Sequence, residues 1–253
     1  MEDTLKIEED FLNSFSQKVF KQSRILILIL YLLLALIRGI GAFGPENIRI
    51  LIMVGFILMW FLPFVFFNKN GRKSIGLTKI KKPIWLLWGF LIGGVAALGI
   101  FGVGMLFTLN STEHWYISII NQVMSPEMRE MLPFVTVFFI TTMPSMIFSP
   151  IGEELFFRGM IHETARKNTN EKAAIVTNSL AFALVHIMHY GFVIDGSNVS
   201  YLFGAGSVWI LLMFALSILF TICRKKSGSI FPAMVAHSSF NLVMCLTTFF
   251  ILL

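Results

Sequence analysis

The sequence predicts an all-α fold, a polytopic membrane bundle of about seven transmembrane helices, with an eighth membrane element as the alternative. Hydrophobic residues make up 56% of the 253 positions, charged residues only 13%, and the mean hydropathy is +0.79. Soluble globular domains carry about 25% charged residues. Seven stretches also approach the length of about 20 apolar residues that a spanning helix needs. These observations favour a membrane protein over a soluble one.

The candidate spans follow one another without an internal repeat or a low-complexity linker, so we expect a single integral membrane domain over 1–253. The fourth span is longer than a bilayer requires, and its end should project into water. The stretch 110–131 is mixed in character, and is either an interfacial helix or the eighth membrane element. The seven spans are 25–43, 50–67, 84–109, 132–165, 173–192, 202–223 and 229–252.

Basic residues predict how the bundle is oriented. With seven spans, 16 of the 20 Lys and Arg residues fall on one side, in the segment 1–24 and in the loops after the second, fourth and sixth spans. Cytoplasmic loops are enriched in Lys and Arg. We therefore expect a plasma-membrane protein with a cytoplasmic N-terminal segment 1–24 and an extracellular C-terminus. The first residues are acidic and lack a basic n-region, so no removable signal peptide is predicted. The same topology accounts for the net charge of +6, and no nucleic-acid partner is expected.

Several ionisable or polar residues lie inside the spans, where they are costly and suggest function. Counted from the basic residues at the inner edge, Glu153, His186, His237 and Asn241 lie 13, 14, 11 and 15 residues into their helices. At a rise of about 1.5 Å per residue, each lies roughly 17–23 Å from that edge. Residues from three spans therefore reach one depth, which predicts a single site.

Helical spacing separates the roles of these residues. Glu154 and Arg158 are four positions apart and share a face, which predicts a structural ion pair. Glu153 points about 100° away and has no partner on its own helix, so we expect an unpaired carboxylate that acts as a general base. Phe182 shares a face with His186 and should pack in the site. Pro150 should disturb the helix one turn before Glu153.

The pattern supports water activation. Glu153 and His186 are predicted to hold and deprotonate a water molecule. His237 and Asn241 are predicted to donate hydrogen bonds to a developing oxyanion, as in amide hydrolysis.

At these residues the sequence resembles the CPBP family, the CAAX proteases and bacteriocin-processing enzymes that are also called Abi proteins. The resemblance covers roughly 130–245. It implies an intramembrane glutamic endopeptidase in which the first glutamate and the middle histidine activate water, the later histidine and asparagine form the oxyanion hole, and the second glutamate pairs with the arginine. The motifs that carry it are Glu-Glu-x-x-x-Arg at Glu153, Glu154 and Arg158, Phe-x-x-x-His at Phe182 and His186, and His-x-x-x-Asn at His237 and Asn241.

Other interpretations stay open at this point. Zinc is the alternative to a cofactor-free site, with Glu153, His186 and His237 as ligands, but an HExxH motif is absent and Asn241 is a poor zinc ligand. His189 is as compatible with packing as with function, and His162 should be solvated on the tail of the fourth helix.

Three functions compete. The first is an endopeptidase that cleaves a prenylated or other membrane-associated peptide near the inner leaflet, with peptide or lipidated peptide and membrane lipid as partners. The second is a non-catalytic bacteriocin self-immunity or membrane scaffold protein, and the third is a transporter or proton relay. The sequence predicts neither the substrate nor the oligomeric state.

Overall fold

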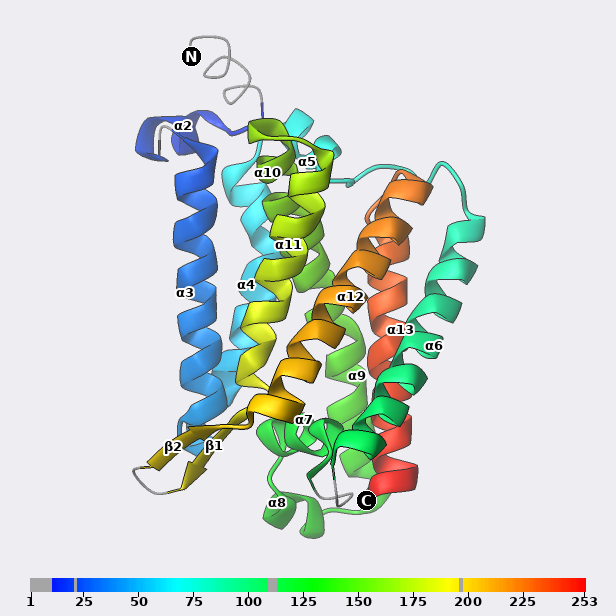
Figure 1. Cartoon of the computed structure of the whole chain (residues 1–253). Coiled ribbons are helices and arrows are strands. Elements are labelled where there is room, and N and C mark those ends of the chain that lie inside the picture. The colour runs from blue at the N-terminus through cyan, green and yellow to red at the C-terminus, as the bar shows by residue number, and fades with distance from the viewer. Residues whose placement is uncertain (1–10, 21, 109–112, 196–197) are drawn as a thin grey trace.

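The computed structural model describes residues 11–20, 22–108, 113–195 and 198–253, and in these ranges it is a bundle of long, nearly aligned helices (Figure 1). The first ten residues and Lys21, on which part of the acidic and basic N-terminal pattern falls, lie outside the described residues. The predicted all-α membrane fold is confirmed. The long helices are α3 (Ser23–Phe43), α4 (Ile50–Phe66), α6 (Ile84–Phe107), α9 (Phe134–Glu153), α11 (Glu171–Val185), α12 (Phe203–Ser227) and α13 (Phe231–Thr247).

Among the described residues, six helices are long and apolar enough to cross a membrane. The fourth of these continues from α9 through a π-helical segment, η3 (Glu154–Ile161), into α10 (His162–Asn168), and α13 ends in a second π-helical segment, η5 (Thr248–Leu252). The expected fifth span is α11, which has only 15 residues. It still runs along the bundle beside α12 (Figure 1). Because α11 also runs along the bundle, α2 (Ser14–Phe20) and η5 lie at its opposite ends.

The fifth span ends earlier than its predicted limit at residue 192. A short 3-10 turn, η4 (His186–Met188), follows α11, and Gly191 then adopts a φ of 120°, in the left-handed region that favours glycine. The chain continues into an antiparallel hairpin, β1 (Phe192–Asp195) and β2 (Asn198–Tyr201), before α12 begins. The predicted span therefore counted η4 and the turn at Gly191 as helix, and of the hairpin only Phe192 fell within it.

The stretch 110–131 does not supply an eighth spanning helix among its described residues. From residue 113 it forms two short helices, α7 (Trp115–Val123) and α8 (Pro126–Glu130). The side chains of His114 and Ser125 cap them by accepting hydrogen bonds from backbone N–H groups. Both helices lie at the end of the bundle that carries the hairpin (Figure 1).

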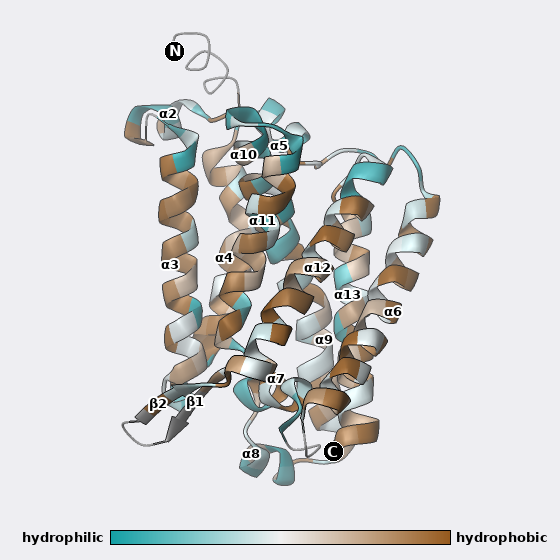
Figure 2. Ribbon diagram, viewed as in Figure 1, coloured by the Kyte–Doolittle hydropathy of each residue, from teal (hydrophilic) through white to brown (hydrophobic). Residues whose placement is uncertain are grey.

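The opposite end of the bundle is basic. It is formed by α2, by α5 (Lys69–Ser74) after α4, and by the last turns of α10 and α12. The last turns of α10 and α12 together carry five Lys and Arg residues. Figure 2 shows hydrophilic residues gathered on α2, α5 and α10, whereas the long helices are mainly hydrophobic along their length. The two ends of the bundle thus differ in their content of basic residues. The side of the membrane that each end faces stays a prediction.

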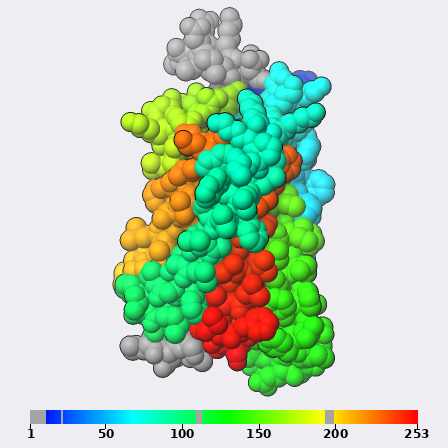
Figure 3. Space-filling model, turned by 90° about the vertical axis from the view of Figure 1, so that its right-hand side faces the viewer, coloured from blue at the N-terminus to red at the C-terminus, as the bar shows by residue number. Residues whose placement is uncertain are grey.

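Helix α6 packs closely on α13 and also contacts α12, as Figure 3 shows from the side. A Cβ at Gly89 would lie 2.5 Å from the carbonyl oxygen of Pro232, and one at Gly93 would overlap the carbonyl of Ala236. Small residues at four-residue spacing allow helix backbones to approach in this way. Ala97, the next residue in the series, is fully buried. This contact fixes α13, which carries His237 and Asn241.

We expect Gly93→Val to destabilise the protein by about 1–3 kcal/mol, because the added methyl groups force α6 away from α13. Thermal unfolding of the purified protein in detergent measures this loss. Gly99 of the same helix is the matched control, since a Cβ there meets nothing within 4 Å. Equal melting temperatures for Gly93→Val and Gly99→Val would contradict the close packing.

Candidate functional site

The site begins where α9 is interrupted. Pro150 has no N–H for the carbonyl of Met146, one turn earlier, and the Ser238 hydroxyl of α13 donates to that carbonyl at 2.7 Å. The Asn241 side chain, one turn further along α13, donates to the neighbouring carbonyl of Ser145 at 2.7 Å. Pro150 therefore leaves the Met146 carbonyl free to accept, and this hydrogen bond attaches α13 to α9. The π-helical segment η3 starts directly after Glu153.

Glu153 is fully buried and is paired with Arg38 of α3. Arg38 Nη1 donates to Glu153 Oε1 at 2.7 Å, and only 5% of the Arg38 residue is exposed. The prediction that Glu153 has no partner is therefore wrong, because the partner comes from the first span and not from its own helix. Glu153 Oε2 has no hydrogen-bond partner among the described residues. It lies 3.7 Å from Nε2 of His237.

His237 lies between the two consecutive glutamates. Its Nδ1 is 2.9 Å from Glu154 Oε1, and its Nε2 faces Glu153 Oε2. Glu154 also forms the expected pair with Arg158, with 3.0 Å between Oε1 and Nη1. Two consecutive helical residues point in different directions, so Glu153 contacts α3 while Glu154 contacts its own helix, and both approach α13.

The Glu154–Arg158 pair is enclosed by aromatic rings. Both side chains are fully buried, and the Arg158 guanidinium carbon lies 4.0 Å from the ring centroid of Phe182 and 5.2 Å from that of Phe220. The Phe182 ring also contacts His186, with centroids 4.1 Å apart. Phe182 thus packs between the ion pair and the site, in the position that helical spacing predicted.

His186 is held in one tautomer. Its Nδ1 lies 2.6 Å from the carbonyl oxygen of Phe182, which can only accept, so Nδ1 carries the hydrogen and Nε2 is left as an acceptor. The indole N–H of Trp209 donates to the His186 carbonyl at 2.9 Å, which fixes the end of α11 against α12. An unprotonated Nε2 is the atom that accepts a hydrogen bond from water.

These residues meet at a cavity of about 300 Å³. Arg38, Phe182, His186, His237 and Asn241 line its inner part, and Glu153 reaches it through Arg38 and His237. Most of the remaining wall is apolar, and the far end is lined by Glu46, Arg49 and Met128. The cavity therefore runs from the site toward the hairpin end of the bundle, away from the basic end.

Sequence reasoning missed Arg38, Gln122 and the partners of His189. His189 Nε2 lies 2.6 Å from Arg38 Nη2, and His189 Nδ1 lies 2.7 Å from Gln122 Oε1, so this histidine belongs to the polar cluster around Glu153. The position of Arg38 inside an apolar span was a signal by itself, because a charge there needs a partner.

The zinc alternative has its three proposed ligands near the same cavity. Among the residues that the structure describes, no group of three or more His, Cys, Asp or Glu side chains is arranged to hold a metal ion. Arg38 binds Glu153 Oε1 and the carbonyl of Phe182 binds His186 Nδ1, so Glu153 Oε2 and His186 Nε2 are the atoms left open. Metal dependence stays a prediction to be tested.

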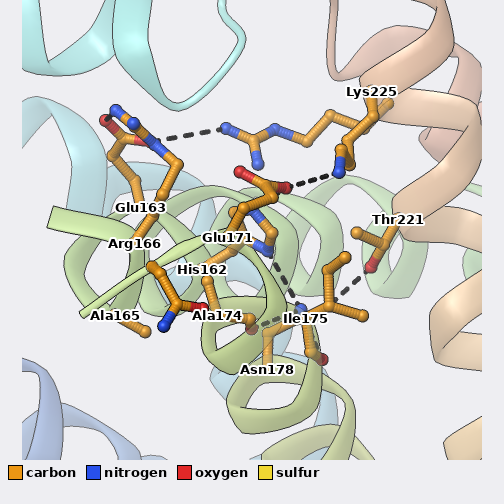
Figure 4. Close-up of polar contacts among 12 residues, drawn as sticks. His162, Glu163, Ala165, Arg166, Glu171, Ala174, Ile175, Asn178, Thr221 and Lys225 are labelled. Carbon is orange, nitrogen blue, oxygen red and sulfur yellow. Dashed lines mark hydrogen bonds and ion pairs between the residues drawn. The ribbon is translucent and has the colours of Figure 1, made fainter.

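A second polar cluster lies near the basic end (Figure 4). His162 is only 1% exposed, so the prediction that it is solvated is wrong. Its Nδ1 lies 3.1 Å from the Asn178 amide nitrogen, and its Nε2 lies 3.3 Å from Glu171, which also binds Lys225 at 2.8 Å. These contacts connect α10, α11 and α12, and none of the four residues lines the cavity.

The fold and the site together define an integral membrane protein with a buried Glu–His–Asn cluster beside a cavity. Residues 134–243 match the model of the family described as type II CAAX prenyl endopeptidase, Rce1-like. The match covers 110 of the 253 residues and agrees with the family that the motifs indicated. Helices α3, α4, α6 and α7 lie outside the matched residues, and Arg38 and Gln122 with them. No curated protein and no solved structure gives a significant match to the chain.

We expect Arg158→Met to reduce the free energy of unfolding by about 3–5 kcal/mol, because the buried Glu154 carboxylate then loses its compensating charge. Replacing Glu154 with Gln in the same protein should recover much of this loss. Thermal unfolding of the two variants in detergent measures both effects. A double variant that is as unstable as Arg158→Met would show that the pair does not account for the loss.

Proposed function

We propose that the protein is an intramembrane endopeptidase that hydrolyses a peptide bond with water activated by Glu153 and His186. The observation that carries this proposal is the free Oε2 of a buried glutamate, which faces His237 at 3.7 Å beside a cavity that His186 and Asn241 also line. The family description, a prenyl endopeptidase, supports the same reaction class.

In the proposed reaction a water molecule lies between Glu153 Oε2 and the acceptor Nε2 of His186. Glu153 takes one proton as the water oxygen forms a bond to the carbonyl carbon of the substrate. The carbonyl oxygen becomes an oxyanion, and the tetrahedral intermediate then breaks its C–N bond. The proton held by Glu153 passes to the leaving nitrogen, which balances the step and restores the carboxylate.

His237 and Asn241 are the proposed donors to the oxyanion. The Asn241 amide nitrogen has two hydrogens, and one is used by the Ser145 carbonyl. His237 Nε2 donates only when both ring nitrogens carry hydrogen, since Nδ1 is held by Glu154. While Glu153 holds the proton from the water, the Glu154 carboxylate beside Nδ1 compensates the charge of this ring.

The apolar wall of the cavity suits an extended apolar peptide or a lipidated peptide as substrate. If the basic end is cytoplasmic, as its charge predicts, the cavity faces the outer leaflet. This differs from the expected cleavage near the inner leaflet. The buried carboxylate beside this cavity favours catalysis over the immunity or scaffold alternative, because a scaffold requires no free carboxylate oxygen there.

Glu153→Gln should reduce cleavage by about 10²–10⁴-fold, because the amide cannot take a proton from water. The assay uses the full chain in liposomes and an internally quenched peptide ending in cysteine, two aliphatic residues and a variable residue, with and without a farnesyl group on the cysteine. Glu130→Gln removes an exposed glutamate of α8 and serves as the control. Normal cleavage by Glu153→Gln would exclude the proposed base. Protection against a bacteriocin that survives alanine at both Glu153 and His186 would favour the immunity alternative.

Metal dependence has its own test. We expect cleavage by the reconstituted protein to survive prolonged treatment with a zinc chelator, because no group of three or more His, Cys, Asp or Glu side chains among the described residues is arranged to hold a metal ion. Complete loss of activity that added zinc restores would establish the metal alternative with Glu153, His186 and His237 as ligands.

A further inference from the structure

A chain of polar contacts connects the site to two helices outside the family match. Glu153 Oε1 binds Arg38 Nη1 at 2.7 Å, Arg38 Nη2 binds His189 Nε2 at 2.6 Å, and His189 Nδ1 binds Gln122 Oε1 at 2.7 Å. Gln122 is in turn held by the backbone, since its amide nitrogen donates to the carbonyl of Met188 at 2.7 Å. The contacts join α3, the end of η4 and α7 to the carboxylate of Glu153.

The donor and the acceptor of each hydrogen bond in this series of contacts can be assigned. A guanidinium only donates, so His189 Nε2 accepts from Arg38. The other nitrogen, Nδ1, then carries the hydrogen and donates to Gln122 Oε1. The histidine is therefore neutral, with one acceptor and one donor both in use, and it holds the Arg38 side chain from the side opposite Glu153.

This series of hydrogen bonds makes the two oxygens of Glu153 different from each other. Oε1 is bound to Arg38, whereas Oε2 has no hydrogen-bond partner among the described residues and faces His237. Arg38 itself is confined, with its guanidinium carbon 5.2 Å from the ring centroid of Phe56 and its side chain only 6% exposed. A carboxylate held at one oxygen by a confined cation cannot rotate freely, so its second oxygen keeps one direction.

We propose that Arg38 is a positioning residue, which His189 and Gln122 hold in place, and that it directs Glu153 Oε2 toward the reacting water. This inference rests on the proposed function. A displacement of about 1 Å in a reacting group can cost about 10²-fold in rate, and side chains that orient such a group need support of their own. The other charged or titratable groups around Glu153 are Glu154, Arg158, His186 and His237.

The first test is kinetic. Arg38→Gln should lower kcat by about 10²-fold and leave KM within about two-fold, because the carboxylate loses its orientation while the substrate still binds. Arg38→Lys should recover part of the loss, since a lysine restores the charge but not the planar fork that reaches Glu153 and His189 together. His189→Asn should give an intermediate loss. The readout is cleavage of the quenched peptides in liposomes.

Arg24→Gln is the matched control, because Arg24 lies on the same helix and contacts Gln22 at the basic end. It should leave kcat and KM unchanged. An Arg38→Gln protein that unfolds at the wild-type temperature and keeps its full kcat would overturn the positioning role, even if Glu153→Gln is inactive. An active Glu153→Gln protein would instead refute the proposed function.

The second test does not depend on activity. Dicyclohexylcarbodiimide enters apolar sites and labels carboxylic acids in preference to carboxylates. Removal of the opposing charge in Arg38→Gln should therefore increase labelling of Glu153 several-fold, as measured by mass spectrometry of peptides. Labelling of Glu154, which keeps Arg158 and His237, should stay the same, and Arg24→Gln should behave as wild type. Equal labelling of Glu153 in wild type and Arg38→Gln would refute the pairing.

Discussion

The buried ion pair between Arg38 and Glu153 is the interaction on which the arrangement of this site depends. A charge enclosed in an apolar bundle is tolerated only with a partner, and removal of either member leaves the other uncompensated. Arg38 lies on α3 and Glu153 lies at the end of α9, 115 positions later in the chain. The pair therefore requires the first span to lie beside the fourth. It also decides which oxygen of Glu153 is left for chemistry.

The neighbouring glutamate is held in a different way. Glu154 pairs with Arg158 on its own helix and with His237 on α13, inside a shell formed by Phe182 and Phe220. Since adjacent helical residues diverge by about 100°, one short segment contacts two different neighbours. The break at Pro150 adds a third attachment through Ser238. The polar groups of the site are thus also the contacts that hold α3, α9 and α13 together.

Much of this could be predicted from the sequence, because spanning helices and their internal polar residues follow directly from hydropathy and helical spacing. Glu154 and Arg158 meet because they are four positions apart, and the shared depth of His186 and His237 reflects their similar distances from basic helix ends. The partner of Glu153 could not be found in the same way. Spacing describes contacts within one helix, whereas the Arg38 contact depends on which helices pack together.

The other departures have similar causes. Hydropathy cannot separate the end of α11 from the 3-10 turn η4 and the turn at Gly191, which the predicted span included. It also cannot show that His162, at the polar end of a helix, is covered by α11 and α12. These are properties of packing between helices.

The family match covers 134–243 and includes Glu153, His186, His237 and Asn241, but Arg38 and Gln122 come from the preceding part of the chain. On this account the N-terminal helices contribute to the site by orienting its carboxylate. A high-resolution structure of the protein in lipid nanodiscs tests this most directly through the distance between Arg38 and Glu153. The account predicts a hydrogen-bonded pair with one free carboxylate oxygen toward the cavity. An Arg38 side chain directed away from Glu153, or both oxygens of Glu153 bound to protein groups, would contradict it.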